Sequence, residues 1–169
     1  MKQTDNFKFD EANIMNELVY RNLSEDEKRQ ICAWKYGGEY DLYNLPSYEE
    51  MQVRQIGFMN PQREKNYYGF WDESILVGFV NILEEKEEVF IGIGVNPDLC
   101  NKHYGQRMLL ITYEISKKLY PDKPLYLEVR TWNIRAVKCY QKAGFRIDGQ
   151  AYELTTGIGT GIFYRMIRE

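Results

Sequence analysis

The residues best placed to do chemistry lie where a strand-like segment, residues 88–95, runs through an irregular loop into a helix that begins near Gly105. The first backbone N–H groups of a helix have no partner within it, and the helix dipole is positive at that end, so such a junction can bind a phosphate. Lys102 and Arg107 add positive charge there. We therefore expect an anion site, although a loop before a helix is by itself a weak signal.

A second candidate is a tyrosine on the helix predicted over residues 134–143. Ala136 and Tyr140 lie one turn apart on one face, so the small residue leaves room beside the phenol. Asn133 is expected to cap this helix, and Gly144 to end it in the left-handed conformation. The phenol is then either a core residue with its hydroxyl at the boundary or a proton donor. Spacing alone leaves both interpretations open.

The cysteines and the histidine are weaker candidates. Cys32, Cys100 and Cys139 are odd in number, widely spaced and without a Cys-x-x-Cys pair, so neither a disulfide framework nor a zinc site is expected. Cys139 has no base beside it in the sequence, which argues against acyl transfer through a thiol. His103, the sole histidine, is expected to be a loop residue near phosphate rather than a catalytic base.

The elements that position these groups begin with a strand at residues 17–21 and a capping box at Ser24. The capping box opens a helix that runs into a loop at residues 34–46, where several aromatic rings sit on backbone broken by glycine and proline. Those rings either cover a small satellite core or line a binding cleft. Ser47 is expected to cap a second helix that ends near Gly57.

The rest of the chain predicts a sheet. Short polar turns between apolar runs indicate antiparallel hairpins, and a strand, helix, strand order around residues 105–129 indicates one parallel pair. Helical spacing starts at Gly105 and Pro121 stops it. We expect one mixed α/β (α+β) domain over residues 1–169, with a mostly antiparallel central sheet and about four helices. The expected strands after the second helix are residues 66–71, 75–84, 88–95, 125–129, 145–154 and 161–167.

Composition narrows the class of protein. A chain of 169 residues fits one domain, with residues 1–14 as a polar extension in which Phe7 and Phe9 alternate as in an edge strand. No apolar run approaches the roughly 20 residues that span a bilayer, and no signal peptide is recognisable, so a cytoplasmic protein is expected. A net charge of −3 disfavours nucleic acid. Acidic clusters at residues 84–88 and 49–50 are either solvated surface or attract a cationic ligand.

Two segments resemble the signature motifs of the GNAT superfamily of N-acetyltransferases. Residues 95–105 resemble its acetyl-CoA pyrophosphate loop, V-x-P-x-x-R/Q-G-x-G-x-G, and residues 127–145 match L-x-V-x-x-x-N-x-x-A-x-x-x-Y-x-x-x-G-F at every signature position. In the first motif the matches are Val95, Pro97 and Gly105. The departures from it are Cys100, Asn101 and His103, which replace the arginine or glutamine and two of the glycines. The resemblance covers about residues 17–169.

The resemblance implies that acetyl-CoA is the acyl donor and lies between a splayed parallel pair, strands 88–95 and 125–129. An amine would attack the thioester directly, a backbone N–H near Val95 would stabilise the oxyanion, and Tyr140 would protonate the leaving thiolate. No metal is implied. The implied binding residues are Ile93, Val95, Cys100, Asn101, Lys102, His103, Tyr104, Gly105, Gln106, Asn133, Ala136 and Tyr140.

The general base has no candidate in these motifs. The strand glutamate used by some relatives corresponds to Val89, and Glu88 should face the other side of the strand. Two alternatives to a general base stay open: water that relays the proton through backbone or tyrosine groups, and an acceptor amine that is already partly neutral.

Residues 34–57 are expected to line the acceptor site, and formation of a homodimer stays open. The leading interpretation is acetylation of a small-molecule or protein amine; the alternative is a non-enzymatic acyl-CoA sensor.

Overall fold

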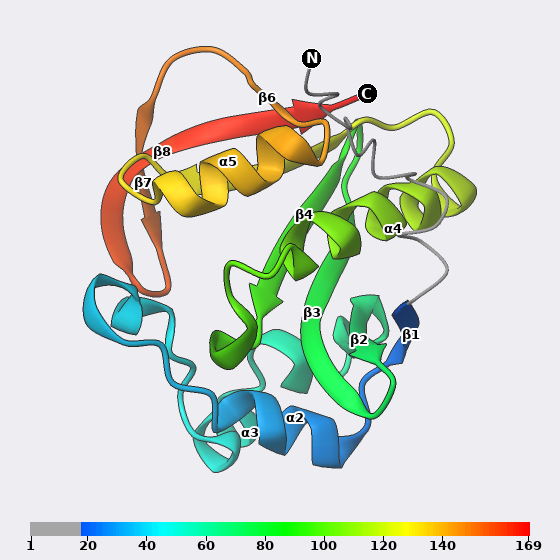
Figure 1. The fold of residues 1–169 in the computed structure, drawn as a ribbon, viewed down its shortest axis with the longest axis vertical. Helices are drawn as coiled ribbons and strands as arrows, with labels where there is room; N and C mark the ends of the chain where they lie inside the picture. Colours follow the sequence, from blue (N-terminus) through cyan, green and yellow to red (C-terminus); the bar gives the residue numbers. More distant parts are fainter. Residues whose placement is uncertain (1–17) are drawn as a thin grey trace, which may run out of the picture.

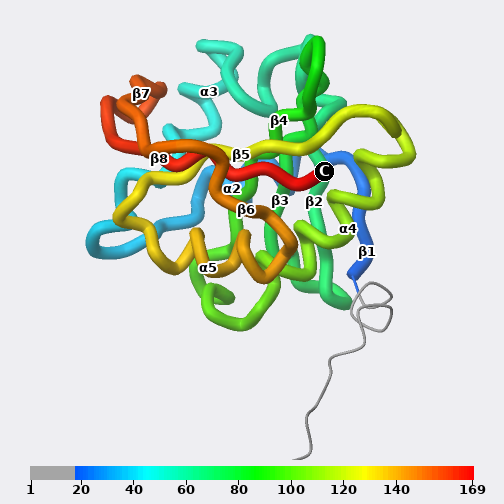
Figure 2. Tube along the Cα trace, turned by 90° about the horizontal axis from the view of Figure 1, so that it is seen from above, coloured from blue at the N-terminus to red at the C-terminus, as the bar shows by residue number. Residues whose placement is uncertain are grey.

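The computed structural model describes residues 18–169, so the extension expected at residues 1–14, with Phe7 and Phe9, lies outside the described part. One mostly antiparallel sheet separates two groups of helices (Figures 1 and 2). This arrangement confirms the expected mixed α/β fold class.

The described strands form one sheet in the order β1-β2-β3-β4-β5-β8-β6, and β7 pairs with β8. Only β4 and β5 pair in parallel, as the sequence predicts; the other described pairs are antiparallel. The strands are β1 (Leu18–Asn22), β2 (Tyr67–Asp72), β3 (Ile75–Glu84), β4 (Val89–Val95), β5 (Leu125–Arg130), β6 (Arg146–Ile147), β7 (Tyr152–Thr156) and β8 (Gly159–Arg168).

The single strand expected over residues 145–154 is wrong, because the segment forms two separate strands, β6 and β7. Between Ile147 and Tyr152 the chain advances five positions while β8 opposite advances three, so two residues bulge out of the pairing. Gly149 has a φ of 76°, a left-handed conformation that glycine adopts without the steric cost of a side chain. Alternation of residue types does not reveal such a bulge.

Three of the described α-helices begin at the N-cap residues that the sequence predicts. The hydroxyl oxygens of Ser24 and Ser47 accept from backbone N–H groups of the first turn, and the Asn133 side chain accepts from the N–H of Ala136 at 3.2 Å. Gly144 has the expected left-handed conformation, with φ of 89°. The helices are α2 (Glu25–Cys32), α3 (Tyr48–Arg54), α4 (Tyr104–Leu119) and α5 (Ile134–Lys142), with 3₁₀ turns η1 (Gly38–Tyr43), η2 (Gly57–Met59), η3 (Glu64–Asn66) and η4 (Pro97–Leu99).

The two faces of the sheet carry different apolar clusters. Helix α4 packs Met108 and Leu109 against one face, where they are fully buried with Ile91. On the opposite face, Trp34 and Phe58 belong to a second cluster under α2, α3 and the loop between them. Of the rings in the aromatic loop, only Trp34 belongs to this second cluster, so a satellite core accounts for one of them. None of the helices in residues 18–169 is both long and apolar enough to cross a membrane.

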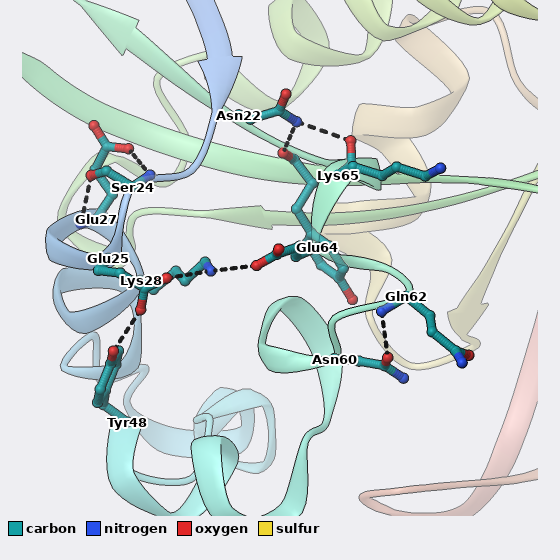
Figure 3. Close-up of polar contacts among 11 residues, drawn as sticks. Asn22, Ser24, Glu25, Glu27, Lys28, Tyr48, Asn60, Gln62, Glu64 and Lys65 are labelled. Atoms are coloured by element: carbon teal, nitrogen blue, oxygen red, sulfur yellow. Dashed lines mark hydrogen bonds and ion pairs between the residues drawn. The ribbon is translucent and has the colours of Figure 1, made fainter.

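An ion-pair network fixes α2 against the chain that leads into β2 (Figure 3). The Lys28 side chain is only 4% exposed, and its ammonium donates to Glu25 at 2.7 Å and to Glu64 at 3.2 Å. The Tyr48 hydroxyl of α3 donates to Glu25 as well, at 2.5 Å. Burial lowers the pKa of Lys28, but the two carboxylates outweigh it and raise the pKa overall. The network therefore holds a buried charge that depends on both partners.

Removing both carboxylates is expected to destabilise the fold. In a Glu25→Gln, Glu64→Gln double variant the Lys28 ammonium stays buried without a counter-charge, so the free energy of unfolding should fall by about 2–3 kcal/mol in urea denaturation. Glu50→Gln is the control, because Glu50 meets Arg54 at 3.0 Å on the exposed face of α3 and should cost less than about 0.5 kcal/mol. Equal losses in both variants would show that the network adds nothing.

Candidate active site

The parallel strands β4 and β5 pair only at their first residues. Their register runs from Val89 opposite Leu125 to Phe90 opposite Tyr126 and ends there. Beyond this point the strands separate, and a cavity of about 860 Å³ opens between them. Its lining comes from both strands, the loop and first turn of α4, helix α5, and the α2 to α3 segment. The splayed pair expected from the sequence is therefore present.

The free edge of β4 directs backbone amides into this cavity. The Val89 N–H donates to the Pro124 carbonyl on the β5 side, whereas the Asn96 N–H donates to Val77 on the β3 side. Because the direction alternates along a strand, the amides of Ile93 and Val95 point to the β5 side, where the pairing has ended. Both residues line the cavity.

The end of β4 is tied to the aromatic loop. The Tyr36 hydroxyl donates to the Val95 carbonyl at 2.5 Å, across 59 positions of sequence. Burial raises the pKa of Tyr36 far above the ordinary tyrosine value, so the hydroxyl keeps its proton. At Gly94, a Cβ atom would lie 2.4 Å from the Phe79 ring, so only glycine lets that ring pack flat on the strand.

The first turn of α4 is a ready anion site. No side chain caps this 16-residue helix. The Arg107 N–H donates to the carbonyl of His103, the residue before the helix, so the preceding N–H groups lack helical partners. Asn101 and His103 have φ values of 63° and 65°, the left-handed region. They stand where the GNAT loop carries glycine, so the loop keeps the glycine conformation despite its side chains.

A tight contact joins α4 to α5 beside this turn. A Cβ atom on Gly105 would lie 2.9 Å from the Cys139 sulfur, so glycine is required for this approach. Burial raises the pKa of Cys139 to about 11 and also raises that of Cys100. Both thiols are therefore protonated near neutral pH, which supports packing and loop roles rather than nucleophilic ones.

Nearly all the binding residues expected from the sequence meet in the cavity lining. Lys102 is the exception, because it is exposed and outside the lining. Arg107 is also outside it, with its guanidinium 3.9 Å from Asp72. The expected residues that do line the cavity are Ile93, Val95, Cys100, Asn101, His103, Tyr104, Gly105, Gln106, Asn133, Ala136 and Tyr140.

Most of the cationic side chains of the lining come instead from α5, a source that sequence reasoning missed, and Arg130 of β5 is the other. Arg135, Lys138 and Lys142 line the cavity and follow one another at i, i+3 and i+7 on one helix face. That spacing was available in the sequence as a signal. Together with the uncapped first turn of α4, these cations give one end of the cavity an anion-binding character.

Tyr140 lies on the wall of the cavity and is half-buried. Burial raises its pKa far above the ordinary tyrosine value, with smaller contributions from the neighbouring Cys139, Tyr43 and Tyr36, while Arg135 opposes the shift. The phenol therefore carries its proton at any physiological pH. It can act as a donor to a group that becomes strongly basic in the cavity.

Glu128 is a further lining residue that sequence reasoning missed. It lies on β5, within the signature segment, and supplies the only carboxylate among the described residues that line the cavity. Burial raises the pKa of Glu128, Glu85 and Glu88 add to the shift, and Arg165 opposes it. Glu88 itself is paired with Arg165 and does not line the cavity. A raised pKa makes Glu128 a better proton acceptor than an ordinary carboxylate.

The acidic clusters noted in the sequence do not line the cavity. Glu84 accepts from Lys123 at 2.6 Å, and Glu85 accepts from the Tyr126 hydroxyl at 3.0 Å. Glu49 lies 3.7 Å from Arg29. Within residues 18–169, no group of three or more histidine, cysteine, aspartate or glutamate side chains is arranged to hold a metal.

Comparison with known proteins agrees with this geometry. The sequence matches the model of the Acetyltransferase (GNAT) family over residues 25–145, and the chain belongs to this family. It is therefore an acyltransferase, of a family whose acyl donor is acetyl-CoA. No protein of curated function matches the sequence.

Solved structures with the same fold share little sequence with this chain. An acetyltransferase from Bacillus anthracis has 17% identity and a TM-score of 0.73, over 90% of this chain and 94% of that one. Spermidine N-acetyltransferase from Vibrio cholerae, in complex with CoA and spermine, has 17% identity and a TM-score of 0.71, over 90% and 95%. The aminoglycoside acetyltransferase AAC(6')-Ib with coenzyme A has 17% identity and a TM-score of 0.68, over 89% and 94%.

Proposed function

We propose that this protein transfers the acetyl group of acetyl-CoA to a primary amine by direct attack within the cavity between β4 and β5. The observation that carries the proposal is the meeting of three groups in that cavity: the free amides of β4, the uncapped first turn of α4 and the protonated Tyr140. A spermidine N-acetyltransferase of this fold has been solved in complex with CoA and the amine spermine, which supports the proposal.

The donor is expected to bind along the α4 and α5 side. The pyrophosphate would accept from backbone N–H groups between Asn101 and Gln106, with Lys138 and Lys142 supplying charge. Pantetheine would follow the free edge of β4, where the amides of Ile93 and Val95 can pair with its own amides. This places the thioester near the end of β4.

The reaction needs three proton transfers besides the attack itself. Glu128 takes the first proton, which the ammonium loses before attack and which later passes to solvent. The amine nitrogen then forms a bond to the thioester carbon, and the oxyanion that results accepts from the Val95 N–H. As the carbon–sulfur bond breaks, Tyr140 donates its proton to the thiolate, and the nitrogen gives up its second proton, which restores the Tyr140 phenol and leaves the neutral amide. Binding geometry supplies much of the remaining rate, because both reactants are held in one cavity.

The donor site is tested by thermal stability. Acetyl-CoA at 100 times its Kd should add about 2.7 kcal/mol to the free energy of unfolding, and the melting temperature should rise accordingly. A Lys138→Ala, Lys142→Ala variant should lose most of this shift at the same concentration, since two phosphate-pairing charges are gone. Lys117→Ala, Lys118→Ala, on the far end of α4, serves as the control. An unchanged shift in the first variant would contradict the assignment.

Transfer itself is tested by release of free CoA, detected with a thiol reagent, in the presence of a panel of primary amines. Release that depends on the amine, with the acetylated amine identified by mass spectrometry, is the expected result. Binding of acetyl-CoA without amine-dependent release across the panel would refute the proposed function.

A further inference from the structure

The acceptor side of the cavity is built from aromatic rings. Six such side chains from separate parts of the chain line it: Trp34, Tyr36, Tyr43, Phe79, Phe90 and Phe163, which we call the aromatic wall. They come from the loop after α2, η1, β3, β4 and β8. Ile31 and Leu45 add aliphatic surface, whereas no residue of α3 lines the cavity.

The aromatic wall is held in place by contacts with the β5 to α5 turn. The Asn133 amide donates to the Tyr43 hydroxyl at 3.2 Å, and the Trp132 ring lies 6.1 Å from the Tyr43 ring and 5.8 Å from the Tyr40 ring. The Arg135 guanidinium lies 3.9 Å from the centre of the Tyr40 ring. The loop is therefore packed onto the β5 to α5 turn before an acceptor binds, which fixes its rings in the cavity lining.

The charges around the aromatic wall allow one ammonium and disfavour a second. Glu128 is the single carboxylate of the described lining. Arg130, which is 7% exposed, lies on the same strand face two residues away; its guanidinium donates to the Gly159 and Thr160 carbonyls and stacks 4.9 Å from the Phe163 ring. Arg130 lines the cavity, its hydrogen-bond partners are backbone carbonyls, and no carboxylate within residues 18–169 forms an ion pair with it, so it adds net positive charge to this side of the cavity.

A polycationic acceptor would need more carboxylates than the single one that lines the cavity within residues 18–169. A second or third ammonium inside the pocket would lose its hydration against aromatic rings and would meet the Arg130 charge, without a carboxylate to pair with. An aromatic or long aliphatic body, by contrast, gains free energy when it leaves water for such a surface.

We propose that the acceptor is a monoamine whose single ammonium meets Glu128 and whose apolar body, aromatic or aliphatic, packs on the aromatic wall. This inference rests on the proposed function and narrows it. It separates this chain from the spermidine and aminoglycoside acetyltransferases that share its fold, since spermine and ribostamycin carry several amino groups.

Two acceptors that differ only in the number of ammonium groups test whether the site prefers a single positive charge. Octylamine and 1,8-diaminooctane have the same chain, and the diamine adds one terminal ammonium and doubles the number of reactive groups. We expect kcat/KM for octylamine to exceed that for the diamine by about tenfold or more, because the second charge must be desolvated against the aromatic wall. Likewise, 2-phenylethylamine should exceed spermidine. A diamine or spermidine used as well as the monoamines would overturn the inference while leaving the proposed function intact.

Two variants of Leu45 then test whether the acceptor binds beside the aromatic wall. Leu45 lines the acceptor side and is half-buried, so Leu45→Glu places a second carboxylate beside the aromatic wall. The ratio of kcat/KM for diamine over monoamine should rise several-fold in Leu45→Glu but stay unchanged in Leu45→Gln, which has the same shape without the charge. An equal response in the two variants would place the acceptor elsewhere. Absence of turnover on every amine, with acetyl-CoA still bound, would refute the proposed function itself.

Discussion

Replacing Tyr140 with phenylalanine is expected to lower kcat by about 10²–10⁴-fold while acetyl-CoA affinity stays unchanged. General acid catalysis has this magnitude, and the thiolate would otherwise leave without a proton. The phenylalanine keeps the ring that packs against the rest of the cavity, so loss of packing does not confuse the result as alanine would. Single-turnover kinetics with thermal-shift measurement of acetyl-CoA binding separate the two effects.

The matched control for Tyr140→Phe is Tyr113→Phe. Tyr113 is a half-buried tyrosine of α4 whose hydroxyl donates to the Glu169 carbonyl at 2.9 Å, outside the cavity. The Tyr113→Phe substitution should leave the rate of the chemical step unchanged. Because burial raises the pKa of Tyr140, the wild-type activity should not fall through loss of its proton until pH is well above 10. A parallel fall in affinity and turnover would give Tyr140 a binding role instead.

Local signals in the sequence predicted most of the elements because each has a short-range physical cause. The Ser24 capping box, the Ser47 and Asn133 caps and the left-handed Gly144 are decided within four residues of sequence. The extent of β3, residues 75–84, follows from a nearly continuous apolar run between two polar turns. The split between β6 and β7 was missed because it depends on the register with β8, which is a long-range contact.

The part of the cavity lining beside α4 and α5 could be predicted from the sequence, but the aromatic wall could not. Each of the two motifs is contiguous in sequence, and their resemblance to GNAT motifs predicted one site for Val95, Asn133 and Tyr140, which all line the cavity. Lys102, expected to bind the cofactor, is exposed and lies outside the cavity lining, between two left-handed residues. The aromatic wall gathers side chains from distant segments, and Glu128 gains its raised pKa only from burial among them.

The acid limb of the pH profile is expected to report Glu128. Because burial raises its pKa above the ordinary glutamate value of 4.5, kcat/KM should fall as pH is lowered through this raised value, where the carboxylate takes up a proton and can no longer accept one from the ammonium. Glu128→Gln keeps the shape and hydrogen bonding of the side chain but cannot accept the proton. We expect it to lower kcat/KM by about 10²–10⁴-fold at neutral pH and to remove that acid limb. Glu153→Gln, an exposed position on β7, is the control.

Stability should change in the opposite direction from activity in Glu128→Gln. A carboxyl whose pKa is higher in the folded than in the unfolded chain binds more protons when folded, so it contributes stability below about pH 4.5 that is lost as pH rises through the folded value. At neutral pH the ionised Glu128 is therefore a cost to the fold, and the glutamine variant should be more resistant to urea than wild type. At pH 4 the two proteins should differ less. A variant that lost both activity and stability at neutral pH would point to a structural role for Glu128, whereas gain of stability with loss of activity is the behaviour of a carboxylate kept for the reaction.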